Sequence, residues 1–127
     1  MNRQLFTLST DTAGAATAGH SVTPQTAILG KLYAIKYVPG TIDTGATVTV
    51  VCIGNGDTKP LLTKANAGTS TTWFYPRDLV NGVADGAALT GTAGGDRCLP
   101  LLDGVLKVAV ASGGGAKLGS IEVYYEC

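Results

Sequence analysis

Apolar and polar residues alternate with a period of two through most of this chain, and helical spacing of apolar residues is almost absent. In residues 4–9, Phe6 and Leu8 share one side of an extended chain, which predicts a first strand near the N-terminus. Residues 46–53 hold the densest run of β-branched side chains and lead into a turn sequence at residues 55–57. They predict the strongest strand of the fold.

Residues 31–38 also alternate, and Pro39 and Gly40 end the pattern. The alternation predicts two sides for this strand: Leu32, Ala34 and Lys36 on one, and Tyr33, Ile35 and Tyr37 on the other. A strand with one regular phase of side chains is therefore expected here.

Residues 105–111 and 120–127 alternate in the same way and are separated by the glycine-rich residues 112–116. Two alternating runs around a flexible turn predict a β-hairpin at the end of the chain. The apolar sides of its two strands are Leu106, Val108 and Val110 on the first, and Ile121, Val123 and Tyr125 on the second.

The remaining segments give weaker signals. Residues 16–22 predict a weak edge strand, and residues 58–64 predict an edge strand because Pro60 cannot donate to a ladder. Residues 70–76 predict a short strand, and residues 77–96 predict a long loop with one turn of helix.

Seven or eight short antiparallel strands without crossover helices predict an all-β fold with little helix. We expect a single domain over residues 1–127, an antiparallel β-sandwich of either jelly-roll or immunoglobulin-like topology. Residues 1–7 are either its first strand or an N-terminal arm.

The charge balance narrows the class of partner. The chain contains nine Lys and Arg residues and nine Asp and Glu residues, so its net charge is zero. Charged residues make up only 14% of the chain, and apolar residues make up 45%. Such a composition excludes disorder driven by charge and argues against nucleic acid as the main partner, because phosphate binding needs clustered cations. A neutral, charge-poor surface suits a protein that packs against neighbouring protein molecules.

No apolar run is long enough for a membrane span, and the N-terminus lacks the apolar run of a signal peptide.

The inventory of reactive side chains predicts no enzyme and no cofactor. His20 is the only histidine and has no paired carboxylate near it in sequence. The glycines before Lys117 lack the spacing of a phosphate-binding loop and join two predicted strands. No metal motif is present, and the cysteines, Cys52, Cys98 and Cys127, are expected to be free thiols in preference to a Cys52–Cys98 bridge.

An aromatic cluster, Trp73, Phe74 and Tyr75, supplies the best candidate contact surface. Neighbours on a strand point to opposite sides, so either Phe74 or the pair Trp73 and Tyr75 faces outward. Exposed Trp and Tyr beside Arg are enriched at interface hot spots. The candidate protein-interface residues are Phe6, Trp73, Tyr75 and Arg77.

Three segments of the chain resemble a group of small structural proteins in the virions of tailed bacteriophages: LFTLSTDTAGAATAG, KLYAIKYVPGTIDTGATVTV and DGVLKVAVASGGGAKLGSIEVYYE. Some small β-rich phage proteins of this size are capsid decoration, or cement, proteins. The resemblance does not extend to residues 58–96.

This resemblance implies a protein that binds the outer surface of the assembled phage head and stabilises it. Its partners would be the major capsid protein and copies of itself in a homo-oligomer, with a trimer favoured, and not nucleic acid or a membrane. It would be made in the host cytoplasm and reside on the capsid exterior. The alternatives are a neck, head-to-tail connector or tail component, and a carbohydrate-binding β-sandwich in which Trp73 and Tyr75 stack on sugar rings.

Overall fold

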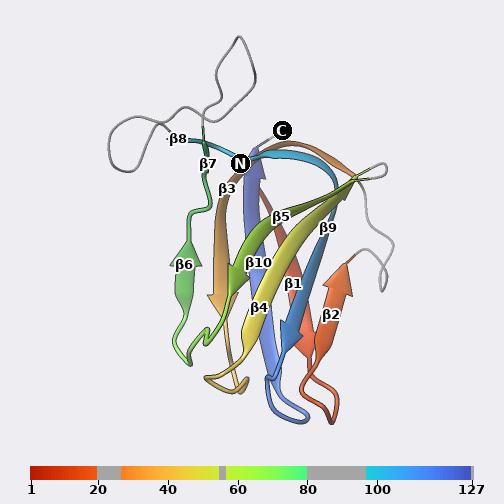
Figure 1. Cartoon of the computed structure of the whole chain (residues 1–127), viewed down its shortest axis with the longest axis vertical. Helices are drawn as coiled ribbons and strands as arrows, with labels where there is room; N and C mark the ends of the chain where they lie inside the picture. The colour runs from red at the N-terminus through yellow and green to blue at the C-terminus, as the bar shows by residue number, and fades with distance from the viewer. Residues whose placement is uncertain (20–26, 55–56, 80–96, 127) are drawn as a thin grey trace.

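The computed structural model describes residues 1–19, 27–54, 57–79 and 97–126, and Figure 1 shows their arrangement. These residues contain no helix, and their strands are β1 (Asn2–Ser9), β2 (Ala16–Gly19), β3 (Ile28–Val38), β4 (Thr47–Gly54), β5 (Asp57–Lys64), β6 (Thr72–Phe74), β7 (Asp78–Leu79), β8 (Arg97–Cys98), β9 (Leu101–Ala111) and β10 (Leu118–Glu126).

Eight of these strands form a two-layered antiparallel sandwich. The first layer has the order β1-β10-β3-β6 and the second has the order β2-β9-β4-β5. The layers are continuous at one corner, where the start of β3 pairs with the start of β9. This order is that of a jelly roll, because nearly every connection crosses from one layer to the other and only β4 and β5 form a hairpin. The predicted all-β sandwich is therefore confirmed, and the topology is the first of the two alternatives.

The core lies between the layers and is built from the inward side of each strand. Its largest fully buried side chains are Leu8, Leu32, Ile35, Tyr37, Ile42, Val48, Val50, Leu102, Leu106, Val108, Ile121 and Val123. These residues lie mostly at the apolar positions of the alternating runs, so alternation in the sequence indicates the buried side of most of the long strands.

Residues 2–7 of the predicted strand or arm belong to the sheet. β1 pairs with β10 along its whole length, from Asn2 opposite Tyr125 to Ser9 opposite Leu118. Of the two expectations for this segment, a first strand or a free arm, the structure shows the strand.

The single phase of alternation predicted for residues 31–38 is wrong. The register of β3 against β10 shifts so that Tyr124 pairs with Ala34 while Tyr125 pairs with Leu32, which leaves Tyr33 as an extra residue. This β-bulge reverses the phase of the strand. Leu32 lies in the core before the bulge and Ile35 after it.

The predicted C-terminal hairpin is also wrong. β9 pairs with β2, β3 and β4 in the second layer, whereas β10 pairs with β1 and β3 in the first. Residues 112–117 therefore cross between layers, and their hydrogen bonds go to neighbouring loops. The amide of Gly113 donates to the carbonyl of Gly14, and the carbonyl of Gly113 accepts from the amide of Asp43, each at 2.9 Å. Alternation identified the buried sides of both strands correctly but carries no information about which layer each strand joins.

The weaker signals had mixed outcomes. β5 is an edge strand as predicted, and Pro60 lies where its register against β4 shifts. The predicted strand over residues 16–22 ends at Gly19 in the described part of the chain. Most of the loop and helical turn predicted for residues 77–96 lies outside the described residues. Its flanks form β7 and β8, a two-stranded sheet that the sequence did not predict, at the end of the molecule where both termini lie (Figure 1).

Candidate functional site

Long aromatic and charged side chains lie in register across the outward side of the first layer. One row crosses all four strands and consists of Leu5 of β1, Glu122 of β10, Lys36 of β3 and Trp73 of β6. The neighbouring row crosses three strands and consists of Arg3, Tyr124 and Ala34. We call these seven side chains, together with Tyr75 just beyond β6, the aromatic face.

Glu122 organises the centre of the aromatic face. Its carboxylate lies 3.4 Å from Nη1 of Arg3 and 3.6 Å from Nζ of Lys36, and it accepts a hydrogen bond of 3.1 Å from the hydroxyl of Tyr124. The Glu122 side chain is only 14% exposed. One carboxylate thus joins side chains from three adjacent strands, which limits their rotamer freedom before any partner binds.

Trp73 is held in place from two directions while remaining accessible. Its ring centroid lies 5.2 Å from that of Tyr124 at an angle of 34°, and Nζ of Lys36 lies 5.4 Å from the indole centroid. These are the distances of aromatic and cation–π contacts. Trp73 is nevertheless 43% exposed. An ordered aromatic ring at the surface loses little entropy on binding, which makes it suitable as an interface anchor.

The structure decides which residues of the aromatic cluster face outward. Tyr75 is 58% exposed, like Trp73 on the surface, whereas Phe74 packs against the core. Arg77 lies close by, where its Nη1 donates to the carbonyl of Tyr33 at 3.0 Å, beside the bulge in β3. Three of the four predicted interface residues are therefore found together on one side of the molecule.

Phe6 does not belong with them. It is 3% exposed and packs in the core on the inward side of β1. The proposed interface role assumed that residues 1–7 leave the domain as an arm; because they form a full-length strand, the side chain of Phe6 is not on the surface. Its outward neighbour Leu5, which is 55% exposed, takes that position.

Sequence reasoning missed most of the aromatic face. Alternation already placed Leu5 opposite in direction to Phe6, and Glu122 and Tyr124 opposite to Ile121 and Val123. Alternation therefore indicated that these three side chains point away from the core. Their assembly into rows required the strand order, which a period of two does not contain.

The outward side of the second layer is different in kind. One row crosses β2, β9, β4 and β5 and consists of Thr17, Ala109, Thr49 and Thr63. The flanking positions on β4 and β9 are Thr47, Val51 and Lys107. We call these seven side chains the threonine face, a surface of small, mostly uncharged groups.

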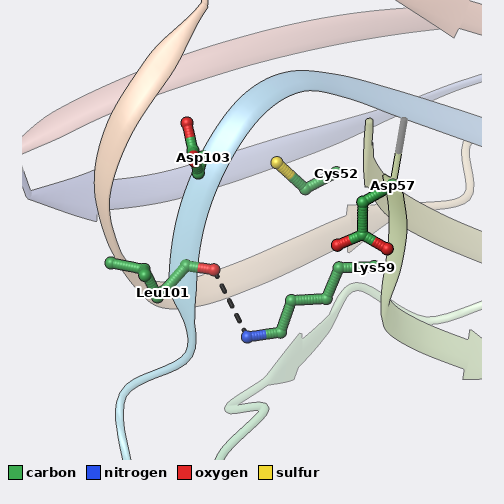
Figure 2. A pocket seen from close by; sticks show the side chains of 5 residues that line it. All are labelled: Cys52, Asp57, Lys59, Leu101 and Asp103. Atoms are coloured by element: carbon green, nitrogen blue, oxygen red, sulfur yellow. Dashed lines mark hydrogen bonds between the residues drawn. The ribbon is translucent and has the colours of Figure 1, made fainter. Parts of the chain in front are cut away.

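A cavity of about 200 Å³ opens between β4, β5 and β9, and Figure 2 shows its lining. It is lined by Cys52, Asp57, Lys59, Leu101 and Asp103. Burial raises the pKa of the Cys52 thiol, so this side chain is a protonated, poorly nucleophilic group at neutral pH. Such a thiol packs as a small hydrophobe.

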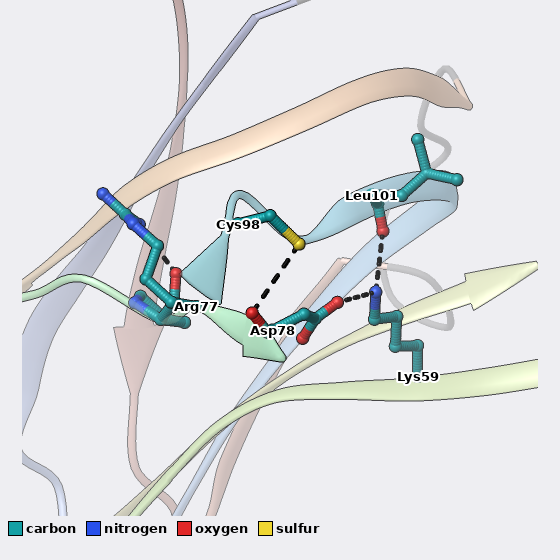
Figure 3. Close-up of polar contacts among 6 residues, drawn as sticks. Lys59, Arg77, Asp78, Cys98 and Leu101 are labelled. Carbon is teal, nitrogen blue, oxygen red and sulfur yellow. Dashed lines mark hydrogen bonds and ion pairs between the residues drawn. The ribbon is translucent and has the colours of Figure 1, made fainter. Parts of the chain in front are cut away.

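Lys59 connects this cavity to the small β7–β8 sheet. Its Nζ lies 2.7 Å from Oδ2 of Asp78 and donates to the carbonyl of Leu101 at 3.3 Å (Figure 3). The thiol of Cys98 contacts the carbonyl of Asp78 at 3.6 Å. Cys52 and Cys98 are both free thiols. The lysine therefore fixes the β7–β8 sheet to the sandwich, and this structural pairing occupies its charge.

Among the residues that the structure describes, no three His, Cys, Asp or Glu side chains come close enough to hold a metal ion. His20 and Cys127 lie outside these residues. Nor does the described chain contain a helix long and apolar enough to cross a membrane.

Comparison of the chain with protein-family models, with curated proteins and with solved structures finds no match. The function is therefore inferred from the aromatic face, the threonine face and the amino-acid sequence.

Proposed function

We propose that this protein is a structural component of a tailed-bacteriophage virion, a decoration protein that binds the outside of the assembled head and stabilises it. The observation that carries the proposal is the aromatic face, an ordered and exposed array of Trp, Tyr, Arg and Lys on a chain of zero net charge. Such residue types mark protein–protein contacts. In this proposal Trp73, Tyr75 and Arg77 lie at a contact between subunits of the particle.

Two further features support this function. The jelly roll is a fold that viral capsid proteins use repeatedly, although fold analogy alone does not establish a function. The threonine face presents few charges, so covering it with another protein requires little desolvation of ionised groups. A protein that binds assembled subunits and not free ones stabilises the assembly by mass action.

A direct test is binding to heads of the phage that encodes the chain. The purified protein should cosediment with assembled heads and not with free capsid subunits, and it should raise the temperature at which the heads lose their DNA. A micrograph of virions that places the subunit only in the neck or tail would reject decoration in favour of the connector or tail alternative.

The first prediction concerns Trp73. Trp73→Ala should weaken attachment to heads about 30-fold or more, as expected for a hot-spot loss of about 2 kcal/mol, and leave the fold intact because the ring is on the surface. Leu29→Ala is the matched control, since Leu29 is 70% exposed but lies at the β3–β9 corner away from the aromatic face. Unfolding of the isolated Trp73→Ala protein would contradict this surface role.

A carbohydrate-binding function is the second candidate, and the exposure of Trp73 and Tyr75 favours it. Sugar rings stack on open aromatic faces. Part of the Trp73 ring already contacts Lys36 and Tyr124, which leaves less of it for a sugar. Glycan-array binding that disappears in Trp73→Ala would establish this alternative over decoration.

A further inference from the structure

We propose that the aromatic face binds the aromatic face of a second copy of this chain, around a two-fold axis that runs parallel to the strands between β10 and β3. This inference rests on the proposed function for its place in the particle, and it deepens that function by naming the partner of the face. The argument comes from the order of side chains along the rows.

The central row has an apolar side chain at each end and opposite charges at its two inner positions, so it is complementary to its own reversed order. From β1 to β6 it runs apolar, acidic, basic and apolar: Leu5, Glu122, Lys36 and Trp73. A two-fold axis in the plane of the interface, parallel to the strands, lays β1 over the partner's β6 and β10 over the partner's β3. Glu122 then faces the partner's Lys36, and Leu5 faces the partner's Trp73. Two-fold symmetry repeats each contact, as in any isologous interface.

The neighbouring row fits the same axis. Arg3 comes to lie over the region of the partner's β6 that continues into Tyr75, where a guanidinium can stack on an exposed ring. Tyr124 comes to lie over the partner's Ala34, a large side chain over a small one. Along both rows no two like charges meet, which is the condition for a self-complementary surface.

The size of the face sets the strength of the dimer. β1, β10 and β3, taken at roughly eight residues each, and the 3 residues of β6 cover about 450 Å² per protomer at a strand spacing of about 4.8 Å. A total of about 900 Å² falls within the range of weak, transient interfaces, so a concentration-dependent dimer is expected. The zero net charge of the chain adds little long-range repulsion between copies.

The threonine face lacks this complementarity. Its central row holds no charged residue, and Lys107 of the adjoining row would meet no acidic partner around an equivalent axis, because Val51 occupies the paired position on β4. It also has no aromatic anchor. The second copy is therefore assigned to the aromatic face, which leaves the threonine face free to contact the head. Trp73→Ala then weakens attachment to heads because it removes the bivalent binding of the dimer.

A charge-exchange experiment tests the inference without any phage particle. Sedimentation equilibrium of the purified chain should show a monomer that becomes a dimer as its concentration rises. Lys36→Glu alone and Glu122→Lys alone should each weaken self-association at least tenfold, because like charges then meet across the axis. An equimolar mixture of the two variants should form heterodimers, because every acidic position of one then faces a basic position of the other.

Three further measurements keep the result decisive. Circular dichroism and thermal unfolding establish that each variant folds. Leu5→Asp, which replaces no member of the ion pairs Arg3–Glu122 and Lys36–Glu122, supplies a second disrupting change if either does not. Lys107→Glu on the threonine face should self-associate like the wild type. A wild-type chain that stays monomeric, a trimer, or a mixture that stays monomeric would each overturn the dimer.

These outcomes are independent of the proposed function. A chain that stays monomeric but still binds heads would leave decoration standing and remove only the dimer. A dimer that never binds heads would support the self-association and reject decoration.

Discussion

The two outer faces of this sandwich cover the same core but present opposite kinds of surface. The aromatic face carries three charged groups, a tryptophan and two tyrosines, and an internal network centred on Glu122 holds several of them in place. The threonine face carries small side chains and Lys107 as its one charged group. The charged side chains are therefore distributed unevenly between the two faces. One face presents ordered aromatic and charged groups, whereas the other presents mostly small, uncharged groups.

The jelly-roll order explains how this contrast arises. β1 and β6 stand at opposite edges of the first layer, although β10 and β3, which lie between them, come from distant parts of the chain. The apolar ends of the central row are therefore supplied by the edges, and its charges by the middle. The second layer is built around β4 and β9, whose outward positions hold Thr and Val, which favour strands, together with Ala and Lys.

The largest expected effect comes from the core that both faces share. Leu106 of β9 is fully buried and lies opposite Cys52 of β4. Leu106→Ala should lower the free energy of unfolding by about 2–5 kcal/mol, through lost burial and the cavity left behind. Urea unfolding followed by the fluorescence of Trp73, the only tryptophan, measures it. Head binding and self-association should then fall together.

Thr49→Ala is the control for this change, since Thr49 occupies the outward side of the adjacent strand. Its effect on the free energy of unfolding should stay within about 1 kcal/mol. If Leu106→Ala had an effect equally small, the two faces would not depend on a common core, and the comparison between them would fail.

Prediction from sequence succeeded where one strand decides the outcome alone. Alternation gave the buried sides of β1, β9 and β10, because burial imposes a period of two on any strand with one face in the core. It failed where the outcome depends on a neighbour. The bulge at Tyr33 is a feature of pairing between β3 and β10, and the apparent C-terminal hairpin required knowing which layer each strand joins.

The same distinction between features of one strand and features of strand pairing applies to the candidate site. Trp73, Tyr75 and Arg77 are close in sequence, so an aromatic cluster was visible without a structure. Leu5 and Glu122 are far apart in sequence and unremarkable by type, and only the ladder registers place them in one row with Trp73. Phe6 was misplaced because its role depended on an arm that proved to be a strand.

A smaller effect is expected beneath the aromatic face. Tyr37 is fully buried, and its hydroxyl has no hydrogen-bond partner among the described residues. A buried, unsatisfied hydroxyl is destabilising, so Tyr37→Phe should raise the free energy of unfolding by about 1 kcal/mol. This would show that the Tyr37 hydroxyl does not stabilise the layer that carries the aromatic face.

The same variant has a pH signature. Burial raises the pKa of Tyr37 in the folded protein above its unfolded value. Above about pH 10 the unfolded state therefore ionises first, and the wild type loses stability that Tyr37→Phe retains. The advantage of the variant should grow as the pH rises from 9 to 11 in thermal unfolding scans. An advantage of Tyr37→Phe over the wild type that stays constant from pH 9 to pH 11 would contradict the assignment.

The smallest effect is expected in the loop that connects the two layers between β1 and β2. The exposed carboxylate of Asp11 accepts hydrogen bonds from the amides of Ala15 and Ala13, at 3.0 and 2.9 Å. These bonds, led by that of Ala15, hold the pKa of Asp11 below its ordinary value. A folded-state pKa below the unfolded one adds stability at neutral pH, and this stability is lost as the pH falls below about 4 and through the folded pKa.

Asp11→Ala should accordingly lower the Tm slightly at pH 7 and converge on the wild type near pH 2. Asp11→Asn keeps an oxygen acceptor without the charge and should lie between the two at pH 7. Because the loop connects the layers without belonging to either face, self-association through the aromatic face should be unchanged in both variants at pH 7. A Tm difference that stays constant from pH 7 to pH 2 would show that the carboxylate's charge does not stabilise this turn, and a change in self-association would show that the faces are coupled through it.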